Sequence, residues 1–177
     1  AARSFTAGSP RTSDLIQRYL IALGSNRRHA RFGRPEQVLG EALDALDASG
    51  VVVECAGPLI RSAPLGPSTR RYANSAALVV TELLPDELLV ALKAIERAFG
   101  RRPGGQRWAS RVLDLDIILW SGGAWVSPGL VVPHREFRER MFVLGPAAAI
   151  APRWRDPVTA LTLRQLKVRL QKPRHKE

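Results

Sequence analysis

Residues 113–120 read Leu-Asp-Leu-Asp-Ile-Ile-Leu-Trp, an alternating start followed by a continuous apolar run. Side chains along a β-strand point alternately to its two faces, so we predict that Asp114 and Asp116 share one face and the leucines beside them take the other. Because the run stays apolar as far as Trp120, we expect this strand to be central in its sheet rather than exposed.

Two carboxylates on one face of a buried strand repel each other and resist desolvation unless a positive group joins them. Oxygen-rich pairs of this kind suit Mg²⁺, which takes one or two carboxylates together with phosphates and water. Two such ions can bridge substrate oxygens and steady an in-line transfer. The alternative interpretation is a half-exposed strand with one solvated face, because a D-x-D pattern alone is weakly specific.

Strands and helices alternate along the chain around this segment. Pro35 and Pro85 each open a helix, since proline is favoured in a first helical turn. Apolar patterning predicts strands at 19–23, 51–55, 59–60, 76–83, 113–120 and 124–126 and helices at 35–49, 85–99, 136–149 and 161–170. The order strand, helix, strand, strand, helix, strand predicts an α+β fold of the ferredoxin-like (split βαβ) kind, with an antiparallel sheet and helices on one face. That fold supports many functions and does not name one.

The length and composition fit one soluble domain. The chain has 177 residues, of which 45% are hydrophobic and 24% charged. A single cysteine, Cys55, excludes an internal disulfide framework and fits a reducing compartment, so we expect a cytoplasmic protein. We expect this thiol to be buried and inert rather than nucleophilic. No apolar run approaches the ~20 residues that a membrane-spanning helix needs.

The formal net charge of +11 is concentrated at the two ends of the chain. Residues 1–18 and 161–177 together carry +7, which leaves +4 for the rest. We predict a disordered extension at 1–18, a catalytic domain at 19–165 and a basic tail at 166–177; the extension has neither the apolar segment of a secretory signal nor the amphipathic period of a transit peptide. Inside the domain, cations concentrate at 97–111 and 135–140, which suggests a compact polyanion such as a triphosphate and leaves RNA open.

A basic loop, Arg101 to Ser110, precedes the acidic strand. Cations next to metal-binding acids are explained if a polyphosphate bridges the two. Gly104 and Gly105 supply a hinge, so the loop is able to close as a lid over the site. The alternative is a solvated basic loop, although Trp108 among polar residues is unusual for one.

Two further stretches carry candidate binding residues. His134 and Arg140 can both donate to phosphate oxygens, with a structural hydrogen bond as the alternative role for His134 and core packing as the default for Phe142. Tyr72 and Asn74 lie two apart in a predicted strand, so a ring and an amide share one face. Such a pair can stack on a flat heterocycle and read its edge, although ordinary packing at the start of a strand explains it as well.

Together these stretches resemble the 6-hydroxymethyl-7,8-dihydropterin pyrophosphokinase family over roughly Tyr19 to Leu163. The run from Arg107 to Ile117 is highly specific, and the other marks are weak singly but occur in the family's order and spacing. The marks are Gly24-Ser25-Asn26, Pro64-Leu65-Gly66-Pro67, Tyr72-x-Asn74, Arg107-Trp108-x-x-Arg111-x-Leu113-Asp114-Leu115-Asp116-Ile117, and Val132-Pro133-His134 followed by Arg140 and Phe142.

The resemblance implies a three-layer α-β-α fold, ATP as donor and two Mg²⁺ ions held by Asp114 and Asp116. It implies transfer of pyrophosphate from ATP to 6-hydroxymethyl-7,8-dihydropterin, giving the pterin diphosphate and AMP, in tetrahydrofolate biosynthesis. The catalytic residues implied are Arg101, Arg111, Asp114 and Asp116; those for the pterin are Ser62, Leu65, Tyr72, Asn74, Trp108 and Phe142; those for ATP are Arg101, Arg111, Ile117, His134 and Arg140.

The chain departs from the family's pattern at Ala109-Ser110, at Pro103-Gly104-Gly105 and at Arg135. These departures fall on the nucleotide side, and from them we predict slower or weaker handling of ATP than is usual in the family. An ATP dissociation constant typical of the family would contradict that prediction.

Two other functions are alternatives to the pyrophosphokinase interpretation. An RNA-binding sheet needs solvent-facing aromatic residues, but aromatics are 6% of the chain and the acidic strand would repel phosphates without a metal. A scaffold that kept only the fold would not need the Asp114 and Asp116 pair together with Tyr72, Asn74 and His134. We therefore expect a monomer acting on small molecules, with neither nucleic acid nor a membrane as a partner.

Overall fold

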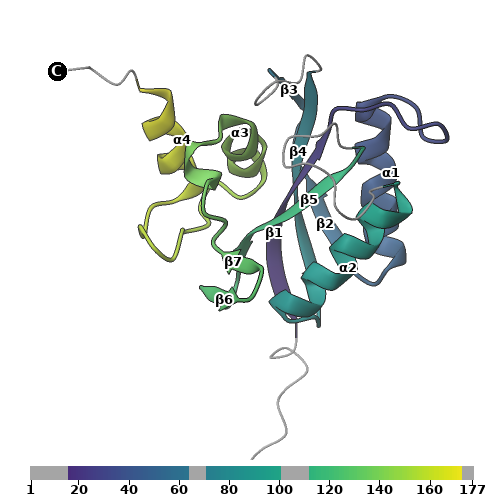
Figure 1. Cartoon of the computed structure of the whole chain (residues 1–177). Coiled ribbons are helices and arrows are strands. Elements are labelled where there is room, and N and C mark those ends of the chain that lie inside the picture. The colour runs from purple at the N-terminus through teal and green to yellow at the C-terminus, as the bar shows by residue number, and fades with distance from the viewer. Residues whose placement is uncertain (1–15, 64–70, 101–111, 173–177) are drawn as a thin grey trace, which may run out of the picture.

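The computed structural model describes residues 16–63, 71–100 and 112–172. Over these residues the chain forms three layers, with a β-sheet between one pair of helices and another (Figure 1). This confirms the predicted α+β, three-layer arrangement. The predicted site residues Leu65, Arg101, Trp108 and Arg111 lie outside the described residues.

The central sheet is antiparallel, and its strand order is that of the ferredoxin-like fold. Four strands follow the order β2-β4-β1-β5. Strand β3 also pairs with β4, at residues 72–74, whereas β2 pairs with residues 77–80 of the same strand. A two-stranded hairpin, β6–β7, stands apart from this sheet. The strands are β1 (Gln17–Ser25), β2 (Val52–Ala56), β3 (Ile60–Ser62), β4 (Tyr72–Thr81), β5 (Asp114–Trp120), β6 (Trp125–Ser127) and β7 (Leu130–Val132).

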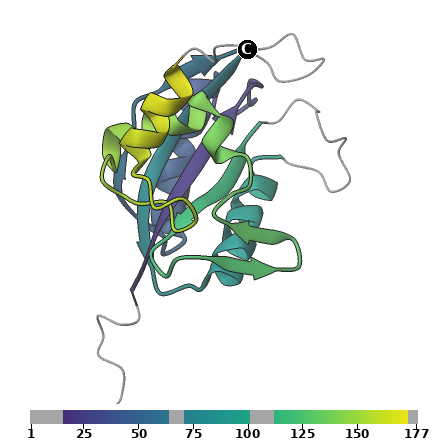
Figure 2. The same cartoon turned by 90° about the vertical axis from the view of Figure 1, so that its left-hand side faces the viewer.

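Helices cover both faces of the sheet (Figures 1 and 2): the two helices of the ferredoxin-like unit share one face, as the element order predicts, and the C-terminal helices cover the other. The helices α1 (Pro35–Ala48) and α2 (Pro85–Ala98) lie on one face; the helices α3 (Met141–Ile150) and α4 (Leu163–Gln171), with the short 3-10 helix η2 (Phe137–Glu139), lie on the other. Each of α1 and α2 begins at the predicted proline. In α2 the Glu87 carboxylate also accepts a hydrogen bond from the Leu84 amide at 2.8 Å, which satisfies a free N–H of the first turn.

Two hydrophobic cores follow from these layers. Beneath α1 and α2 the core includes Tyr19, Ile21 and Leu115, all fully buried. On the other face, Leu20 and Phe137 are fully buried in a second core with α3 and α4. The sheet is therefore buried on both faces, as an internal layer must be.

The expectation that residues 113–120 form a central strand is wrong, because β5 is the terminal strand of the described sheet. The strand is apolar because helical layers cover both faces of the sheet, not because it has a neighbouring strand on each side. Its outer edge is covered by other groups: Glu96 of α2 accepts a hydrogen bond from the Leu115 amide at 2.8 Å, and the His134 amide donates to the Ile118 carbonyl at 3.0 Å. Such covering removes the pairing hazard of an open edge.

Several element limits differ from the prediction. Strand β4 includes Tyr72 and Asn74, as predicted, but it runs without a break into the strand predicted at 76–83 and ends at Thr81; β7 was not predicted. The single helix expected at 136–149 is divided into η2 and α3 because Arg140 has an extended backbone, with φ −108° and ψ 99°. The domain limits of 19 and 165 remain predictions, although β1 begins at Gln17 and α4 ends at Gln171. None of the described helices combines the length and apolar character that a membrane span requires.

Candidate functional site

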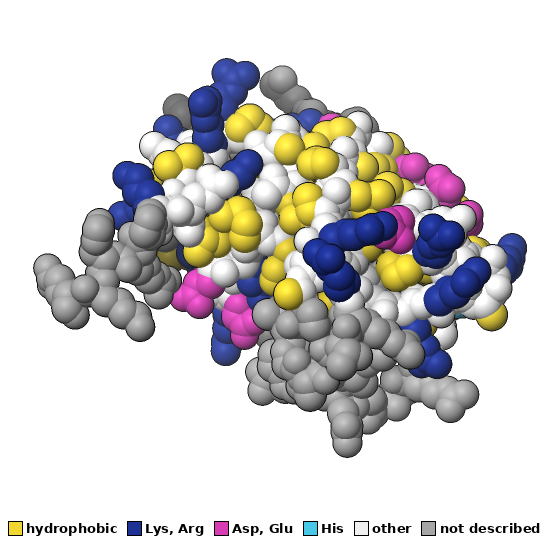
Figure 3. Space-filling model, turned by 90° about the horizontal axis from the view of Figure 1, so that it is seen from above, with side chains coloured by type: hydrophobic (Ala, Val, Ile, Leu, Met, Phe, Trp, Pro, Cys, Tyr) yellow, Lys and Arg dark blue, Asp and Glu magenta, His cyan; other side chains and the backbone are white. Residues whose placement is uncertain are grey.

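A cavity of about 650 Å³ lies against the sheet, and every predicted site residue that the structure describes is part of its lining. The lining comes from β1, β3, β4 and β5, from α2 and α3, and from the segment between β6 and α3. Figure 3 views the end of the sheet where β1 finishes; Lys and Arg side chains are spread over this face and acidic ones are few. The predicted residues in the lining are Ser62, Tyr72, Asn74, Asp114, Asp116, Ile117, His134, Arg140 and Phe142.

The floor of the cavity is made of small residues of β1. Gly24 is paired in register with Asn74 of β4 on one side and with Asp114 of β5 on the other. Ala22 is likewise next to Asp116. A side chain at Gly24 would place its Cβ 3.6 Å from Asn74 Oδ1, in the space between the amide and the carboxylate. The absence of that side chain keeps a flat surface open between the polar residues of β4 and β5.

One wall of the cavity, which we call the strand wall, consists of Ser62, Tyr72 and Asn74 with Phe142 of α3. The Asn74 side-chain amide donates to Ser62 Oγ at 2.9 Å, and its residue is only 4% exposed. This bond uses the amide nitrogen, so the amide oxygen and the remaining N–H are oriented by it. The wall thus combines an amide oriented by Ser62 with two aromatic residues.

The two acids of β5 stand between this wall and the opposite one. Burial and the neighbouring Asp114 carboxylate raise the pKa of Asp116, and His134 and Lys93 oppose that rise only in part. Within the described residues, no group of three or more His, Cys, Asp or Glu side chains is arranged to hold a metal ion. A cation at this pair would therefore need oxygen ligands from substrate or water in addition to the two carboxylates. That is the ligand set that Mg²⁺ takes.

His134 lies beside the acids with one ring nitrogen already used. Its Nδ1 accepts a hydrogen bond from the Glu136 amide at 3.2 Å, which leaves Nε2 as the protonated nitrogen of the neutral ring. Burial, together with the charge of Arg140, lowers the pKa of His134 although Asp116 acts in the opposite direction. The lowered pKa favours the neutral imidazole, which presents one N–H donor at Nε2.

Arg140 lies at the start of α3 and joins the two sides of the cavity. Its guanidinium forms an ion pair with Glu136 and lies 5.7 Å from the centre of the Phe142 ring. Its side chain is 24% exposed, so the charge remains within reach of a ligand in the cavity. A cation held between an acid and an aromatic ring is well placed to bind an anion.

The other wall, which we call the loop wall, was largely missed by sequence reasoning. It consists of the β6–β7 hairpin and the segment from His134 to Arg140. Lys93 of α2 also lines the cavity, where its ammonium pairs with the fully buried Glu96 carboxylate at 2.9 Å. A lysine and a glutamate three apart on the apolar side of a helix were the one available signal for that pair. The hairpin residues in the lining are Val126, Ser127, Gly129, Leu130 and Val131.

Comparisons with known proteins point to one family. Residues 20–152 match the family described as 7,8-dihydro-6-hydroxymethylpterin-pyrophosphokinase (HPPK). The chain is 41% identical over 145 residues to a 2-amino-4-hydroxy-6-hydroxymethyldihydropteridine pyrophosphokinase of Pseudomonas aeruginosa, covering 81% of this chain and 86% of that protein. To the protein of the same name from Synechocystis it is 37% identical over 136 residues, covering 72% and 69%.

A solved structure shows the same fold. The HPPK-DHPS protein of Plasmodium falciparum superimposes with a TM-score of 0.62 at 12% sequence identity. The match covers 87% of this chain and 42% of that one. At this identity the likeness concerns the fold alone.

Proposed function

The chain belongs to the 7,8-dihydro-6-hydroxymethylpterin-pyrophosphokinase family, and from that premise we propose how its cavity carries out the reaction. It transfers pyrophosphate from ATP to 6-hydroxymethyl-7,8-dihydropterin, a step of folate biosynthesis. ATP is the co-substrate. The proposal concerns which residues hold each substrate.

The pterin occupies the strand wall. Its flat ring lies over Gly24 between Tyr72 and Phe142, where aromatic faces provide apolar contact on both sides. Asn74 reads the edge of the ring through an amide that Ser62 already orients. Leu65 and Trp108 complete this pterin site in the proposal.

The acids of β5 take the metal. Asp114 and Asp116 hold Mg²⁺, which supplies positive charge to the phosphate oxygens when it is bound. The support for this assignment is that both carboxylates lie two residues apart on β5 in the lining of the cavity, where their mutual repulsion, which helps to raise the pKa of Asp116, would be relieved by a cation. This chain's own contribution is to hold two carboxylates on one face of a strand, facing the substrates.

The triphosphate extends from the acids along the loop wall. His134 donates its Nε2–H to a phosphate oxygen and Arg140 offers a guanidinium, while Ile117 lines the nucleotide site. Arg101 and Arg111 act on the phosphates as catalytic cations in the proposal. The pterin hydroxymethyl oxygen attacks the β-phosphorus, and AMP leaves. Catalysis then comes from positioning and charge neutralisation, as is usual in phosphoryl transfer.

The observation that carries this arrangement is the row formed by Asn74, Gly24 and Asp114 across three paired strands. Neighbouring strands are about 4.8 Å apart, so the row sets the amide and the acid about 10 Å apart. A bound pterin on the amide thus carries its hydroxymethyl group toward the acids. We also propose that the enzyme acts as a cytoplasmic monomer. Size-exclusion chromatography with light scattering would test the monomeric state.

The test is a Mg²⁺-dependent assay with ATP and the pterin that separates AMP from ADP. We expect AMP and pterin diphosphate in equal amounts from the wild type and neither from Asp116→Ala. Asp44→Ala is the matched control, because Asp44 is an exposed acid of α1 outside the cavity. ADP as the nucleotide product would contradict the proposed attack on the β-phosphorus. Full activity in Asp116→Ala would contradict the metal assignment.

A further inference from the structure

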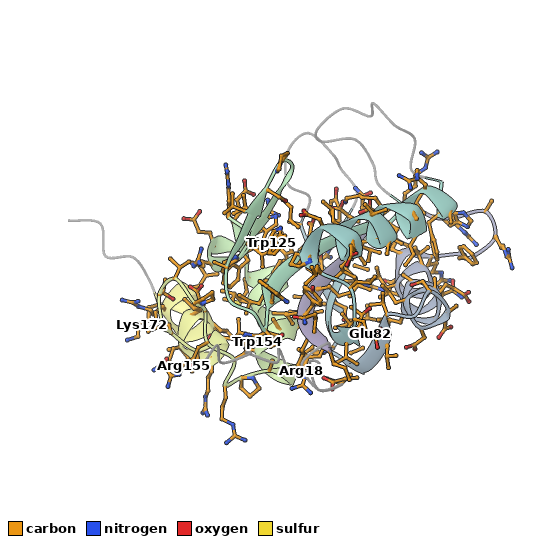
Figure 4. All side chains as sticks on the ribbon, turned by 90° about the horizontal axis from the view of Figure 1, so that it is seen from below. Arg18, Glu82, Trp125, Trp154, Arg155 and Lys172 are labelled. Carbon is orange, nitrogen blue, oxygen red and sulfur yellow. The ribbon has the colours of Figure 1, made fainter. Side chains whose placement is uncertain are left out.

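The β6–β7 hairpin forms part of the loop wall, and we propose that Asp86 of α2 is the residue that positions it. The hairpin lies beside α2 (Figure 2), and Trp125 at its base projects toward that helix (Figure 4). No residue of the predicted site comes from the hairpin, so its placement is a separate structural problem. The proposal deepens the proposed function, because it assigns the hairpin to the nucleotide rather than to the pterin.

One carboxylate joins the hairpin to α2 through two hydrogen bonds. Asp86 Oδ2 accepts from Trp125 Nε1 at 3.2 Å, and Oδ1 accepts from Ser127 Oγ. Both donors are on β6, at the two ends of that three-residue strand. Asp86 is in the first turn of α2, where an acid is favoured by the helix dipole. The acceptor is therefore held firmly while it binds two groups of the hairpin.

The hairpin depends on such a contact because it belongs to no larger sheet. Two strands of three residues each are marginally stable on their own. Strand β7 is anchored by Leu130 and Val132, which are buried in the core. Strand β6 has less support: Val126 is 78% exposed, and Trp125 meets Trp120 edge to face at 5.5 Å between ring centres. Trp125 is itself only partly buried against that core, so the two Asp86 bonds add to a limited apolar anchor on β6.

The strand wall is built without the hairpin. Ser62, Tyr72 and Asn74 are held by β3 and β4, which pair with each other and not with β6 or β7. Loss of the Asp86 contact should therefore disturb the nucleotide side of the cavity and leave the pterin side intact. This predicts a split between the two Michaelis constants, which a general loss of stability would not produce.

The test compares Asp86→Ala with Glu87→Ala, its neighbour in the same helical turn. Glu87 caps the helix through the Leu84 amide, and among the described residues no hydrogen bond or ion pair joins it to the hairpin, so its loss controls for weakening of α2. We expect Asp86→Ala to raise KM for ATP about 10-fold, the range for hydrogen bonds to a charged group, with KM for the pterin and kcat changed by less than about 2-fold. Glu87→Ala should leave both constants within about 2-fold of the wild type.

Two further variants keep the proposal testable if Asp86→Ala does not fold. Trp125→Phe keeps an aromatic ring and loses only the indole N–H, and should raise KM for ATP about 3-fold. Asp86→Asn keeps one acceptor for Ser127 and should recover part of the affinity lost in Asp86→Ala. An equal rise in Asp86→Ala and Glu87→Ala would overturn the proposal. So would a rise in KM for the pterin as large as that for ATP.

A measurement without turnover separates this inference from the proposed function. Amide hydrogen exchange of the full-length protein should become faster in residues 124–132 of Asp86→Ala and remain unchanged there in Glu87→Ala. A non-hydrolysable ATP analogue should slow that exchange in the wild type. Unchanged exchange in Asp86→Ala would overturn the positioning role even if the wild type makes AMP. Faster exchange in a protein that makes no AMP would instead count against the proposed function alone.

Discussion

The two walls of the cavity are held in place by different kinds of bond. The strand wall consists mainly of residues on β3 and β4, which are fixed by main-chain hydrogen bonds along a ladder that runs through β1 to β5; Phe142 of α3 completes it. The loop wall consists of a short hairpin and an irregular segment, which side-chain carboxylates fasten to their neighbours. A main-chain ladder keeps its hydrogen bonds when one side chain is removed. A segment held by a single side-chain carboxylate, which we call a clamp, loses its attachment when that carboxylate is removed; Asp86 is the first such clamp.

The second clamp is Asp156, which precedes α4. Its carboxylate accepts two bonds from the guanidinium of Arg138, each 2.7 Å long, and others from Thr159 Oγ1 and the Val158 amide. The Asp156 side chain is fully buried, and Arg138 lies in η2, between His134 and Arg140. The clamp therefore fixes the segment whose two ends line the cavity.

The largest effect is expected at the acids between the walls. Asp116→Asn should lower kcat about 10³-fold, because the proposed metal site loses a charged ligand. The same change should leave the melting temperature equal to or above that of the wild type, because it removes one of two neighbouring carboxylates whose charges repel each other. Steady-state kinetics and calorimetry would measure both. A lower melting temperature would show that Asp116 is a structural residue like Asp156.

The next largest effect is expected at the Asp156 clamp. Asp156→Ala leaves Arg138 without its carboxylate partner, and we expect it to lower the free energy of unfolding by about 3 kcal/mol. Because η2 connects His134 to Arg140, KM for ATP should rise more than KM for the pterin. Urea denaturation and steady-state kinetics would check this, with Glu54→Ala as the control, because it breaks the exposed Arg18–Glu54 ion pair away from the cavity. Equal rises in both Michaelis constants would show that the two walls are not independent.

A smaller effect is expected on the strand wall. Asn74→Ala should raise KM for the pterin about 10-fold, the value of one or two lost hydrogen bonds, and leave KM for ATP within about 2-fold. Stability should fall by no more than about 1 kcal/mol, since the main-chain ladder of β4 remains. Ser62→Ala, which loses only the partner of the Asn74 amide, should give a smaller change in the same direction. A larger loss of stability in Asn74→Ala than in Asp156→Ala would reverse the contrast between the walls.

The acids of β5 and the β4 residues of the strand wall were predictable from sequence, and the loop wall mostly was not. Alternation along a strand places Asp114 and Asp116 on one face, and the spacing of Tyr72 and Asn74 does the same for β4. Strand β7 has only three residues, too few to show a period. The contact of Asp86 with Ser127 joins residues 41 apart in the chain. A local pattern carries no information about such a pair.

Tertiary contacts also explain the one error about the sheet. An apolar run predicts that a strand is covered on both faces, and β5 is covered on both faces. The run carries no information on whether a strand or a helix lies along the edge of β5. Here Glu96 of α2 takes the place of a neighbouring strand at Leu115. The order of elements nevertheless fixed the topology, because short right-handed connections leave few arrangements for strand, helix, strand, strand, helix, strand.

The smallest effect concerns pH, and it distinguishes Asp156, whose pKa is lowered, from Asp116, whose pKa is raised. Burial by itself would raise the pKa of Asp156, but the hydrogen bonds from Arg138, Thr159 and Val158 hold that pKa below its usual value. A carboxyl group with a depressed folded-state pKa contributes stability above its unfolded pKa, near 3.9, and loses it as the pH falls through the folded value. The difference in free energy of unfolding between the wild type and Asp156→Asn should therefore be constant above about pH 5 and narrow below about pH 4. Urea titrations from pH 2.5 to 6.5 would measure it. A difference that already narrows near pH 6 would mean that burial outweighs the clamp, and Asp156 would then resemble Asp116, whose pKa is raised.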